Sequence, residues 1–480
     1  MAVKRALVTG SVIDGFLVGE KLHSGGMATL WKVTRDDINI PIVMKVPMIL
    51  DGDDATTIVG FEMEQMILPT LSGIHVPKLF AIGDFSVQPY IVMEYINGTS
   101  LLPRLDDAPL PVDEVISLGG RVATALNDLH RQHVIHLDIK PSNIMIRATG
   151  EAAFIDFGLS RHDMLPDLLA EEFHLPMGTG PYISPEQIRH NRSDPRSDIF
   201  SLGVLLYHLL THQRPFGFPR SNRALNKRMW RDPVPPRVYN KECPPWLQEI
   251  ILKCLESNPK DRYPTAAMLA FDLSHPDQVR LTERATKMKQ DGMMTALGRW
   301  WKVSTSDPAP VTAISTGIVK APIIMVAVDL SEGMELLAET LRVHVRRVLD
   351  TIPGARLACI NVLKTNRIGV NYPLDSEGRN IHVQRLVDLK GWAQPLGLIS
   401  EQVTFHVLEE PDPAAALIEY ARSNHVDQIL IGARASSTMR RYLGSVSSDV
   451  VAQAPCTVTV VRIPERTKSA LEAELDALEA

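Results

Sequence analysis

Long apolar stretches are absent from this chain. The sequence contains no uninterrupted run of about eighteen apolar residues, the length that a helix needs to cross a bilayer. Its N-terminus also lacks the apolar core of a secretory signal peptide. We therefore expect neither a transmembrane segment nor export, and we place the chain in the cytoplasm.

Cysteine is scarce, and no excess of basic residues is present. The four cysteines show neither the spacing of a metal site nor that of a disulfide framework, which fits a reducing compartment. The net charge is -6, and the lysines and arginines look scattered along the chain. Because phosphate binding needs a clustered positive field, this composition predicts that nucleic acid is not a partner.

What the chain does have is length and an ordinary globular composition. Its 480 residues, 45% hydrophobic and 22% charged, suffice for roughly two to three domain-sized cores. A polar segment rich in Pro, Ser and Thr over residues 276–319 reads as a linker. The parts before and after it carry different patterns and predict different folds.

The most informative stretch is residues 136–158. It reads His-Leu-Asp-Ile-Lys-Pro-Ser-Asn up to Asn143, and Asp-Phe-Gly follows from Asp156. Phosphoryl transfer needs a carboxylate that orients the attacking hydroxyl and accepts its proton, and oxygen ligands that hold a divalent metal against the phosphates. Asp138 suits the first task, and Asn143 and Asp156 suit the second. The stretch resembles the catalytic loop and Asp-Phe-Gly motif of eukaryotic-type protein kinases, in their bacterial form.

The resemblance extends upstream, to the loop that folds over the nucleotide phosphates in this family. Residues 22–30 are similar to that loop and include Gly25 and Gly26. His23 and Ala28 stand where the family usually has its first and third glycines. The match is therefore partial, and only the two central glycines offer an unhindered backbone near the phosphates.

The phosphate-binding lysine of the family corresponds to Lys45, which ends an apolar run that begins at Pro41. A buried lysine needs a carboxylate partner. The helical stretch 56–71 offers Glu62 and Glu64, and the family spacing favours Glu64. We expect a buried pair between Lys45 and Glu64.

An apolar run over residues 90–96 reads as a buried strand that enters the hinge between the two lobes of such a kinase. The resemblance makes Met93 the gatekeeper and turns the backbone of Glu94 and Ile96 toward adenine. The implied cofactors are ATP and Mg2+ or Mn2+, with the metal on Asn143 and Asp156. The predicted ATP contacts are Gly25, Gly26, Leu30, Lys45, Met93, Glu94, Ile96, Asn143 and Asp156.

Motifs of the second lobe follow in order. Residues 184–186 resemble the end of the activation segment, Asp198 the residue that braces the catalytic loop, and Arg262 the late partner of Glu186. Lys140, two residues after Asp138, is the pattern of serine/threonine kinases and implies serine or threonine acceptors on proteins.

These resemblances imply an α+β bilobal kinase fold. The kinase domain covers residues 13–275, with its N-lobe over 13–95 and its C-lobe over 96–275. The implied catalytic residues are Asp138, Lys140, Lys45 and Glu64.

Leu137 departs from the family pattern, which usually has an arginine before the catalytic aspartate to bind a phosphorylated activation segment. Between Gly158 and Ser184, hydroxyls are few and include Thr179 in a Gly-Thr pair that shapes the substrate-facing loop in such families. We expect a kinase whose activation does not depend on phosphorylation of that segment. The alternative is that Arg161 takes over the role of the missing arginine.

From about residue 320 the pattern changes to strands that alternate with helices, which predicts an α/β doubly wound parallel sheet over residues 320–464. A helical tail over residues 465–480 follows. Expected strands are 323–328, 356–362, 403–408, 428–432 and 456–462, with helices near 334–348 and 413–424.

The carboxyl edge of this sheet resembles that of the universal stress protein family. Asp329 ends the first strand, Gly432 ends the fourth, and Gly444 with Ser445 opens the last helix, as in the nucleotide-binding members. The loop between the two glycines differs from the family pattern in its second glycine and in its length. The resemblance implies a second adenine nucleotide on these four residues and a homodimer through the C-terminal domain.

The sequence thus predicts a serine/threonine protein kinase that transfers the γ-phosphate of ATP to proteins, itself included, coupled to a nucleotide-sensing or dimerising stress domain in bacterial signalling. A second interpretation is a nucleotide-binding scaffold without catalysis, suggested by the irregular glycine loop and by Leu137. A third is a kinase that acts on a small molecule.

Overall fold

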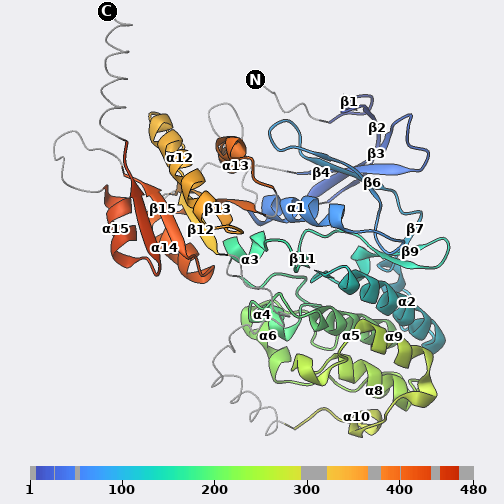
Figure 1. The fold of residues 1–480 in the computed structure, drawn as a ribbon. Coiled ribbons are helices and arrows are strands. Elements are labelled where there is room, and N and C mark those ends of the chain that lie inside the picture. Colours follow the sequence, from blue (N-terminus) through green and yellow to red (C-terminus); the bar gives the residue numbers. More distant parts are fainter. Residues whose placement is uncertain are drawn as a thin grey trace, which may run out of the picture. The chain divides into compact units, whose positions relative to one another are not determined.

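The computed structural model describes residues 7–25, 27–48, 55–173, 175–292, 322–365, 380–399, 402–433 and 444–463. The chain divides into two compact units (Figure 1). The first consists mainly of residues 1–48, 59–84 and 88–315, and the second mainly of residues 316–480. Gly26 and the predicted tail over 465–480 lie outside the described residues.

The N-terminal part of the first unit is an antiparallel sheet with strand order β1-β2-β3-β4-β6-β5. The central strand β4 is buried along almost its whole length, whereas β2 reaches the surface, as a strand nearer the edge does. Phe16, Trp31 and Met44 form part of the core of this sheet. The strands are β1 (Val12–Ile13), β2 (Phe16–Ser24), β3 (Ala28–Thr34), β4 (Ile42–Pro47), β5 (Leu79–Gly83) and β6 (Tyr90–Glu94).

Helix α1 (Ala55–Ile67) lies beside this sheet and buries Phe61, Met63 and Ile67. The predicted helix over 56–71 ends earlier because Pro69 cannot donate a backbone hydrogen bond, and a 3-10 turn η1 (Leu68–Thr70) follows. A Cβ added to Gly60 would lie 3.1 Å from the Gly158 carbonyl oxygen. This close approach sets α1 directly on the glycine of the Asp-Phe-Gly motif.

The remainder of the first unit is built on α2 (Val112–Arg131), α5 (Arg196–Thr211), α8 (Pro245–Cys254) and α9 (Ala266–Ser274). Helix α2 is amphipathic, with buried residues such as Val115, Leu118 and Val122 at helical spacing. Helix α5 is buried on all sides from Ser197 to Thr211, which makes it the centre of this core.

Short elements connect these helices and shape the catalytic region. A three-stranded sheet has the order β10-β9-β7, and β11 pairs with β8. The elements are β7 (Gly98–Ser100), η2 (Pro103–Leu105), β8 (Val134–Ile135), η3 (Pro141–Asn143), β9 (Ile144–Arg147), β10 (Ala152–Phe154), β11 (Arg161–His162), α3 (Leu168–Glu172), α4 (Pro185–Ile188), α6 (Asn222–Asn226), η4 (Lys227–Met229), α7 (Pro236–Tyr239) and η5 (Pro259–Asp261).

Residues 276–292, the first part of the predicted linker, contain η6 (Pro276–Gln278) and α10 (Glu283–Thr286), and α10 packs against α8. The buried Gln248 side chain donates to the carbonyl oxygens of Arg284 at 2.7 Å and Lys287 at 2.9 Å. Such contacts satisfy the backbone of a segment that has little regular structure of its own. The first unit therefore continues past α9.

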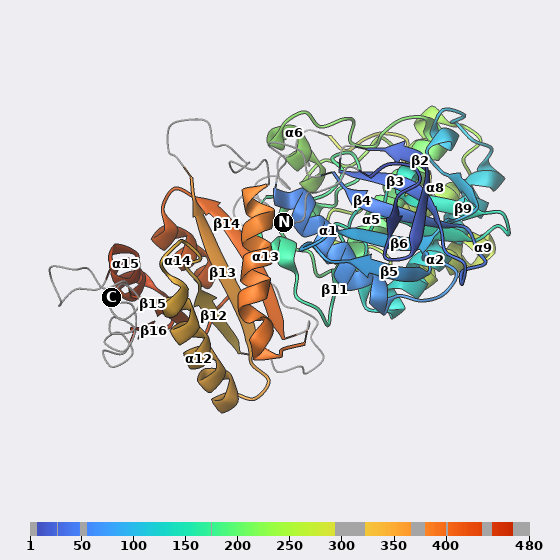
Figure 2. The same cartoon turned by 90° about the horizontal axis from the view of Figure 1, so that it is seen from above.

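The second unit is a five-stranded parallel sheet with strand order β14-β13-β12-β15-β16, seen from above in Figure 2. This order and direction confirm the predicted doubly wound sheet. The strands are β12 (Ile323–Ala327), β13 (Arg356–Lys364), β14 (Val403–Glu410), β15 (Gln428–Gly432) and β16 (Thr457–Val461).

Helices cover both faces of that sheet. Helices α12 (Glu335–Thr351) and α13 (Ile381–Ala393) share one apolar cluster with the strands, and α14 (Pro413–Ser423) and α15 (Ser445–Gln453) share another. Helix α13 was not predicted, although its buried residues Val383, Leu386 and Leu389 stand at helical spacing.

Candidate active site

Lys45, at the end of the apolar run on β4, contacts two carboxylates. Its Nζ lies 2.5 Å from Glu64 Oε2 on α1 and 3.0 Å from Asp156 Oδ1. Of the two glutamates considered in the sequence, Glu64 is the one that reaches the lysine. The Glu64 side chain is 1% exposed and that of Asp156 is 45% exposed, so the group runs from the core to the solvent.

The three charges shift one another's protonation. Burial lowers the pKa of Lys45, but Asp156 and Glu64 together outweigh it and raise this pKa above its ordinary value. Lys45 also holds the pKa of Asp156 down to about 2. Burial raises the pKa of Glu64, with Lys45 acting in the opposite direction. At neutral pH the lysine and the aspartate are both ionised.

Asp138 is buried and both of its carboxylate oxygens are engaged. Thr179 donates to Oδ1 from its backbone nitrogen at 3.1 Å and from Oγ1 at 2.6 Å. Lys140 Nζ donates to Oδ2 at 2.6 Å, and Asn143 Nδ2 donates to the same atom at 3.1 Å. The predicted residues Asp138, Lys140 and Asn143 thus form one cluster, which the substrate-facing loop joins through Thr179.

Asn143 and Asp156 offer the oxygen ligands that a magnesium or manganese ion prefers. Asn143 uses its amide nitrogen on Asp138, so its amide oxygen is the atom it can offer to a metal. The low pKa of Asp156 keeps its carboxylate charged, and its side chain is partly open to solvent. One carboxylate and one amide oxygen suit a metal that takes its other ligands from phosphates and water. The two residues therefore fit the implied metal.

The glycine loop lies between β2 and β3. The Gly25 amide donates to the Ala28 carbonyl oxygen at 3.0 Å, and a Cβ on Gly25 would meet the His23 ring at 3.4 Å. Leu30 on β3 pairs in register with Lys45 on β4. The described part of the loop is thus a tight turn whose second strand runs beside the lysine.

The hinge follows β6. Met93 and Ile96 are buried, and Glu94 uses its carboxylate in an ion pair with Arg147 at 2.5 Å. The Glu94 amide donates to the Lys78 carbonyl oxygen at 2.8 Å. The Glu94 side chain is therefore held by Arg147, and the Glu94 amide by the Lys78 carbonyl oxygen.

Asp198 on α5 fixes the start of the catalytic loop. Its carboxylate accepts from the backbone nitrogens of His136 at 2.9 Å and Leu137 at 2.8 Å. Leu137 has a positive φ of 62° and a side chain that is 2% exposed. Gln187 Nε2 donates to the Leu137 carbonyl oxygen at 2.8 Å. The Leu137 side chain therefore occupies a core position. Its backbone nitrogen and carbonyl oxygen form the hydrogen bonds to Asp198 and Gln187.

The activation segment is held by an arginine outside the catalytic loop. Arg192 Nε donates to Asp167 Oδ2 at 2.8 Å, and Arg192 Nη2 donates to the Leu159 carbonyl oxygen at 3.0 Å. Arg161, the alternative raised by the sequence, lies 3.9 Å from the same Asp167 carboxylate. Neither the Arg192 contact nor its partner Asp167 was predicted, because no motif links them.

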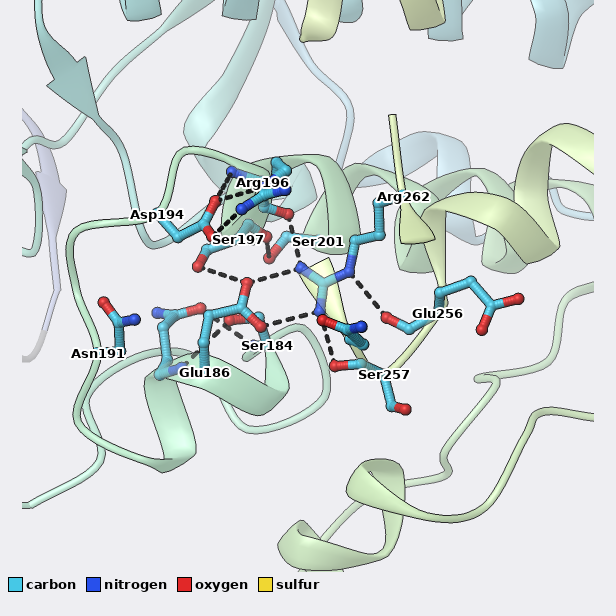
Figure 3. Close-up of polar contacts among 12 residues, drawn as sticks. Ser184, Glu186, Asn191, Asp194, Arg196, Ser197, Ser201, Glu256, Ser257 and Arg262 are labelled. Carbon is cyan, nitrogen blue, oxygen red and sulfur yellow. Dashed lines mark hydrogen bonds and ion pairs between the residues drawn. The ribbon is translucent and has the colours of Figure 1, made fainter. Parts of the chain in front are cut away.

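A second buried ion pair follows the substrate-facing loop and is drawn in Figure 3. Arg262 donates to both carboxylate oxygens of Glu186, at 2.6 and 2.8 Å. Ser197 Oγ donates to Glu186 at 2.7 Å, and the Arg262 guanidinium also reaches the carbonyl oxygens of Arg196 and Glu256 at 2.8 Å. Both charged groups of this buried pair are thus hydrogen-bonded. The pair, here named the brace, joins α4 to α5.

In the second unit, Asp329 and Gly432 follow or end the adjacent strands β12 and β15. Asp329 Oδ1 accepts from Ser331 Oγ at 2.5 Å, and a Cβ on Gly432 would lie 2.8 Å from Leu337. Gly444 caps α15, whose first residue is Ser445. The loop between the glycines, residues 434–443, lies outside the described residues. The structure therefore describes Asp329 and Gly432 before this loop, and Gly444 and Ser445 after it.

Comparisons with known proteins give two family matches. Residues 16–273 match the model of the protein kinase domain. Residues 321–462 match the model of the universal stress protein family.

Similar curated proteins are bacterial kinases. Serine/threonine-protein kinase PknB of Mycobacterium leprae is 31% identical over 265 residues, which is 54% of this chain and 42% of that protein. Serine/threonine-protein kinase PknL of Mycobacterium bovis is 31% identical over 259 residues, or 54% of this chain and 64% of that protein. The match therefore spans less than two thirds of each relative.

Among solved structures, the PknI kinase domain of Mycobacterium tuberculosis is 21% identical, with a TM-score of 0.45. The match covers 56% of this chain and 99% of that chain.

Within the described ranges of this chain, no helix is both long and apolar enough to cross a membrane.

Proposed function

The chain belongs to the protein kinase family, and on that premise we propose that it transfers the γ-phosphate of ATP to serine or threonine hydroxyls of proteins, itself included. The kinase domain covers residues 13–275 in this proposal, and a stress domain covers 320–464. The observation that carries it is the contact of Lys45 with both Glu64 and Asp156, since a kinase must have its lysine–glutamate pair and its metal-binding aspartate in place together.

Asp138 is the residue that orients the acceptor. Its Oδ1 already accepts a hydroxyl hydrogen bond, from Thr179 at 2.6 Å, which is the type of contact that an acceptor serine or threonine would make. An attacking hydroxyl loses its proton to this carboxylate. Lys140 and Asn143 hold the other oxygen and keep the carboxylate in one orientation.

Lys45 binds the phosphates of ATP, and Glu64 keeps the lysine in position. The raised pKa of Lys45 keeps its side chain positively charged, so it can bind phosphate across the physiological pH range. Asn143 and Asp156 would hold Mg2+ or Mn2+. When bound, the metal neutralises charge on the phosphates.

The test is phosphate transfer from labelled ATP, with magnesium present, to a generic acceptor protein by the purified chain. Asp138→Asn should reduce the rate by roughly a thousandfold or more, because the side chain keeps its size but loses its basic oxygen. A folded Asp138→Asn protein that transfers phosphate at the original rate would disprove the proposal.

A scaffold without catalysis is not favoured by the geometry. The groups that inactive kinases commonly lack are all present and in contact, in two clusters around Lys45 and Asp138. Leu137 does not break the catalytic loop, because Asp198 and Gln187 bond to its backbone. We therefore retain catalysis as the proposed function.

For the C-terminal domain we propose nucleotide binding or dimerisation that is coupled to the kinase. Gly444 and Ser445 at the start of α15 support the first role, and the edge position of β16 supports the second, because an edge strand can pair with a second copy. Calorimetry with ATP, ADP and AMP on the Asp138→Asn full chain and on the same chain with Gly444→Asp tests the first role. Equal heats from both proteins would exclude the Gly444 site.

A cytoplasmic location is part of the same proposal. All four cysteines are free, and Cys243, Cys254 and Cys359 are buried. Burial raises the pKa of Cys243 and Cys254 to about 12, so these thiols stay protonated and unreactive. Free structural thiols suit a reducing compartment.

A further inference from the structure

A basic segment stands out against the acidic average of the chain. Residues 214–231 contain six lysines and arginines and no aspartate or glutamate, whereas the whole chain has a net charge of -6. This basic segment includes α6 and η4. We did not predict this cluster, because the cations look scattered along the whole chain.

The charges of the basic segment are largely exposed. Five of its six cations are exposed. None of the six forms an ion pair with a carboxylate in the described ranges of the chain. Arg231 has an uncharged partner, the Gln290 side chain, at 3.2 Å. The exposed cations are Arg214, Arg220, Arg223, Lys227 and Arg231.

The sixth cation, Arg228, ties the basic segment to the substrate-facing loop, residues 178–183. Its side chain is 1% exposed, and its guanidinium donates to the carbonyl oxygens of Gly180 at 2.8 Å and Ile183 at 2.5 Å. Burial lowers the pKa of Arg228 to about 10, which still leaves it charged at neutral pH. Its hydrogen bonds go to carbonyl oxygens, so its charge is solvated by the loop but is not neutralised.

Two further contacts place the segment at this loop. A Cβ on Gly180 would lie 3.4 Å from Pro219 of the basic segment. Helix α6 packs against α4, which directly follows the loop (Figure 1). The loop in turn reaches the catalytic centre through Thr179 and Asp138. The positive field of the basic segment therefore lies beside the loop that would receive an acceptor.

We propose that the basic segment binds acidic residues that flank the acceptor serine or threonine of the substrate protein. This inference rests on the proposed kinase function and names the class of substrate for the same site. An acidic peptide is favoured over a nucleic acid because the charges adjoin the substrate-facing loop itself, where a polypeptide must lie for transfer to occur. Exposed charges of this kind attract partners through complementary potential.

Steady-state kinetics with two synthetic peptides test the inference. One has a single threonine flanked by aspartates and glutamates, and the other has asparagine and glutamine in their places. The variant Arg220→Gln/Arg223→Gln/Lys227→Gln should raise KM for the acidic peptide by roughly three- to thirtyfold, as expected for three exposed ion pairs. The kcat, the KM for ATP and the KM for the neutral peptide should not change.

A matched variant, Lys241→Gln/Lys260→Gln/Arg280→Gln, removes the same charge from exposed positions outside the basic segment and should leave KM for the acidic peptide unchanged. Added salt should raise that KM for the unmodified chain and have less effect on the Arg220/Arg223/Lys227 variant.

Three results would overturn the inference. They are equal KM values for the two peptides, equal effects of the two triple variants, and a loss of duplex oligonucleotide binding by the Arg220/Arg223/Lys227 variant without a change in peptide KM. Transfer to a generic acceptor must be measured in parallel. Absence of that transfer would refute the kinase function, whereas its presence with equal peptide KM values would refute only the acidic preference.

Discussion

Two buried ion pairs of the first unit, Glu186–Arg262 and Glu64–Lys45, differ in how fully their charged groups are enclosed. Glu186 and Arg262 form the brace, in which both charged groups are buried and further hydrogen bonds come from Ser197 and from backbone carbonyls. Glu64 and Lys45 form the clamp, in which the lysine has a second carboxylate partner, Asp156, that is 45% exposed. A glutamate–cation pair is thus enclosed in the brace, whereas in the clamp it is connected to a partly exposed carboxylate.

The difference shows how a buried pair can be read for its role. Removing one partner of a fully surrounded pair leaves an uncompensated charge in the core. In the clamp, the pKa of Glu64 is already raised, so this carboxyl can take up a proton if the lysine is lost. We therefore expect the brace to govern stability and the clamp to govern activity.

Breaking the brace should have the largest effect. Arg262→Met should destabilise the first unit by about 3 to 5 kcal/mol, because Glu186 is left buried and unpaired. Hydrogen exchange of the α5 amides across a urea series would measure it. Lys32→Met, at an exposed pair with Glu20, is the control and should not shift the transition. An equal shift for both variants would contradict the comparison.

Breaking the clamp should reduce activity and spare the fold. Lys45→Met should lower kcat/KM for ATP by roughly a hundred- to a thousandfold, which corresponds to about 3 to 4 kcal/mol of transition-state stabilisation. The urea transition should move far less than in Arg262→Met. Glu64→Gln, which retains the lysine, should lose less activity. A large loss of stability in Lys45→Met would mean that the clamp is also structural.

Acid stability can be tested apart from both pairs at His208, which is buried and has no carboxylate partner among the described residues. Burial lowers the pKa of His208 to about 4. Below its ordinary pKa near 6.5, the unfolded chain binds a proton that the folded chain does not, so stability falls as the pH drops from about 6.5 to 4. After allowance for solvent screening, His208 should account for about 1 to 2 kcal/mol of that loss.

The measurement is the urea midpoint as a function of pH. His208→Leu should show a flatter dependence between about pH 6.5 and 4 than the unmodified chain. His23→Leu, at an exposed position on β2, should keep the original dependence. Identical curves for all three proteins would show that His208 does not contribute.

The smallest effect is expected for dephosphorylation, because the activation segment is held by Arg192 and Asp167 and not by an arginine beside Asp138. Phosphatase treatment should leave the initial rate toward an added acceptor unchanged. Asp167→Asn should lower that rate by roughly fivefold, since it weakens a charge-assisted hydrogen bond of about 1 kcal/mol. A strong dependence on a phosphate between residues 159 and 183 would refute this account.

The fold class of both units could be predicted from the sequence, and so could the residues that cluster around Lys45 and Asp138. Those residues lie in short motifs at regular spacing, so order along the chain was enough to group them. Strand β15 was predicted at its observed bounds, Gln428–Gly432, because it is a short apolar run that closes with glycine.

Other features depend on contacts between segments that share no motif. Arg192 and Asp167 meet only after the activation segment has folded back, and Arg228 is buried although the adjacent Lys227 is exposed. The basic segment escaped notice because the whole-chain charge averages over it. Helix α13 carried a readable period but lies after residues 366–379, whose pattern suggested no element. Local patterns predict elements, whereas side-chain partners need the tertiary fold.

Thr179 also bears on how ATP is treated while no acceptor protein is bound. Its hydroxyl and its amide both bond to Asp138 Oδ1, and Lys140 and Asn143 bond to Oδ2. A water molecule that approaches Asp138 must therefore compete with donors that are already bonded to it. A bound protein makes other contacts, which can offset the free-energy cost of displacing Thr179. We expect hydrolysis of ATP in the absence of an acceptor protein to be slow. Thr179→Ala should raise the ratio of ATP hydrolysed to phosphate transferred.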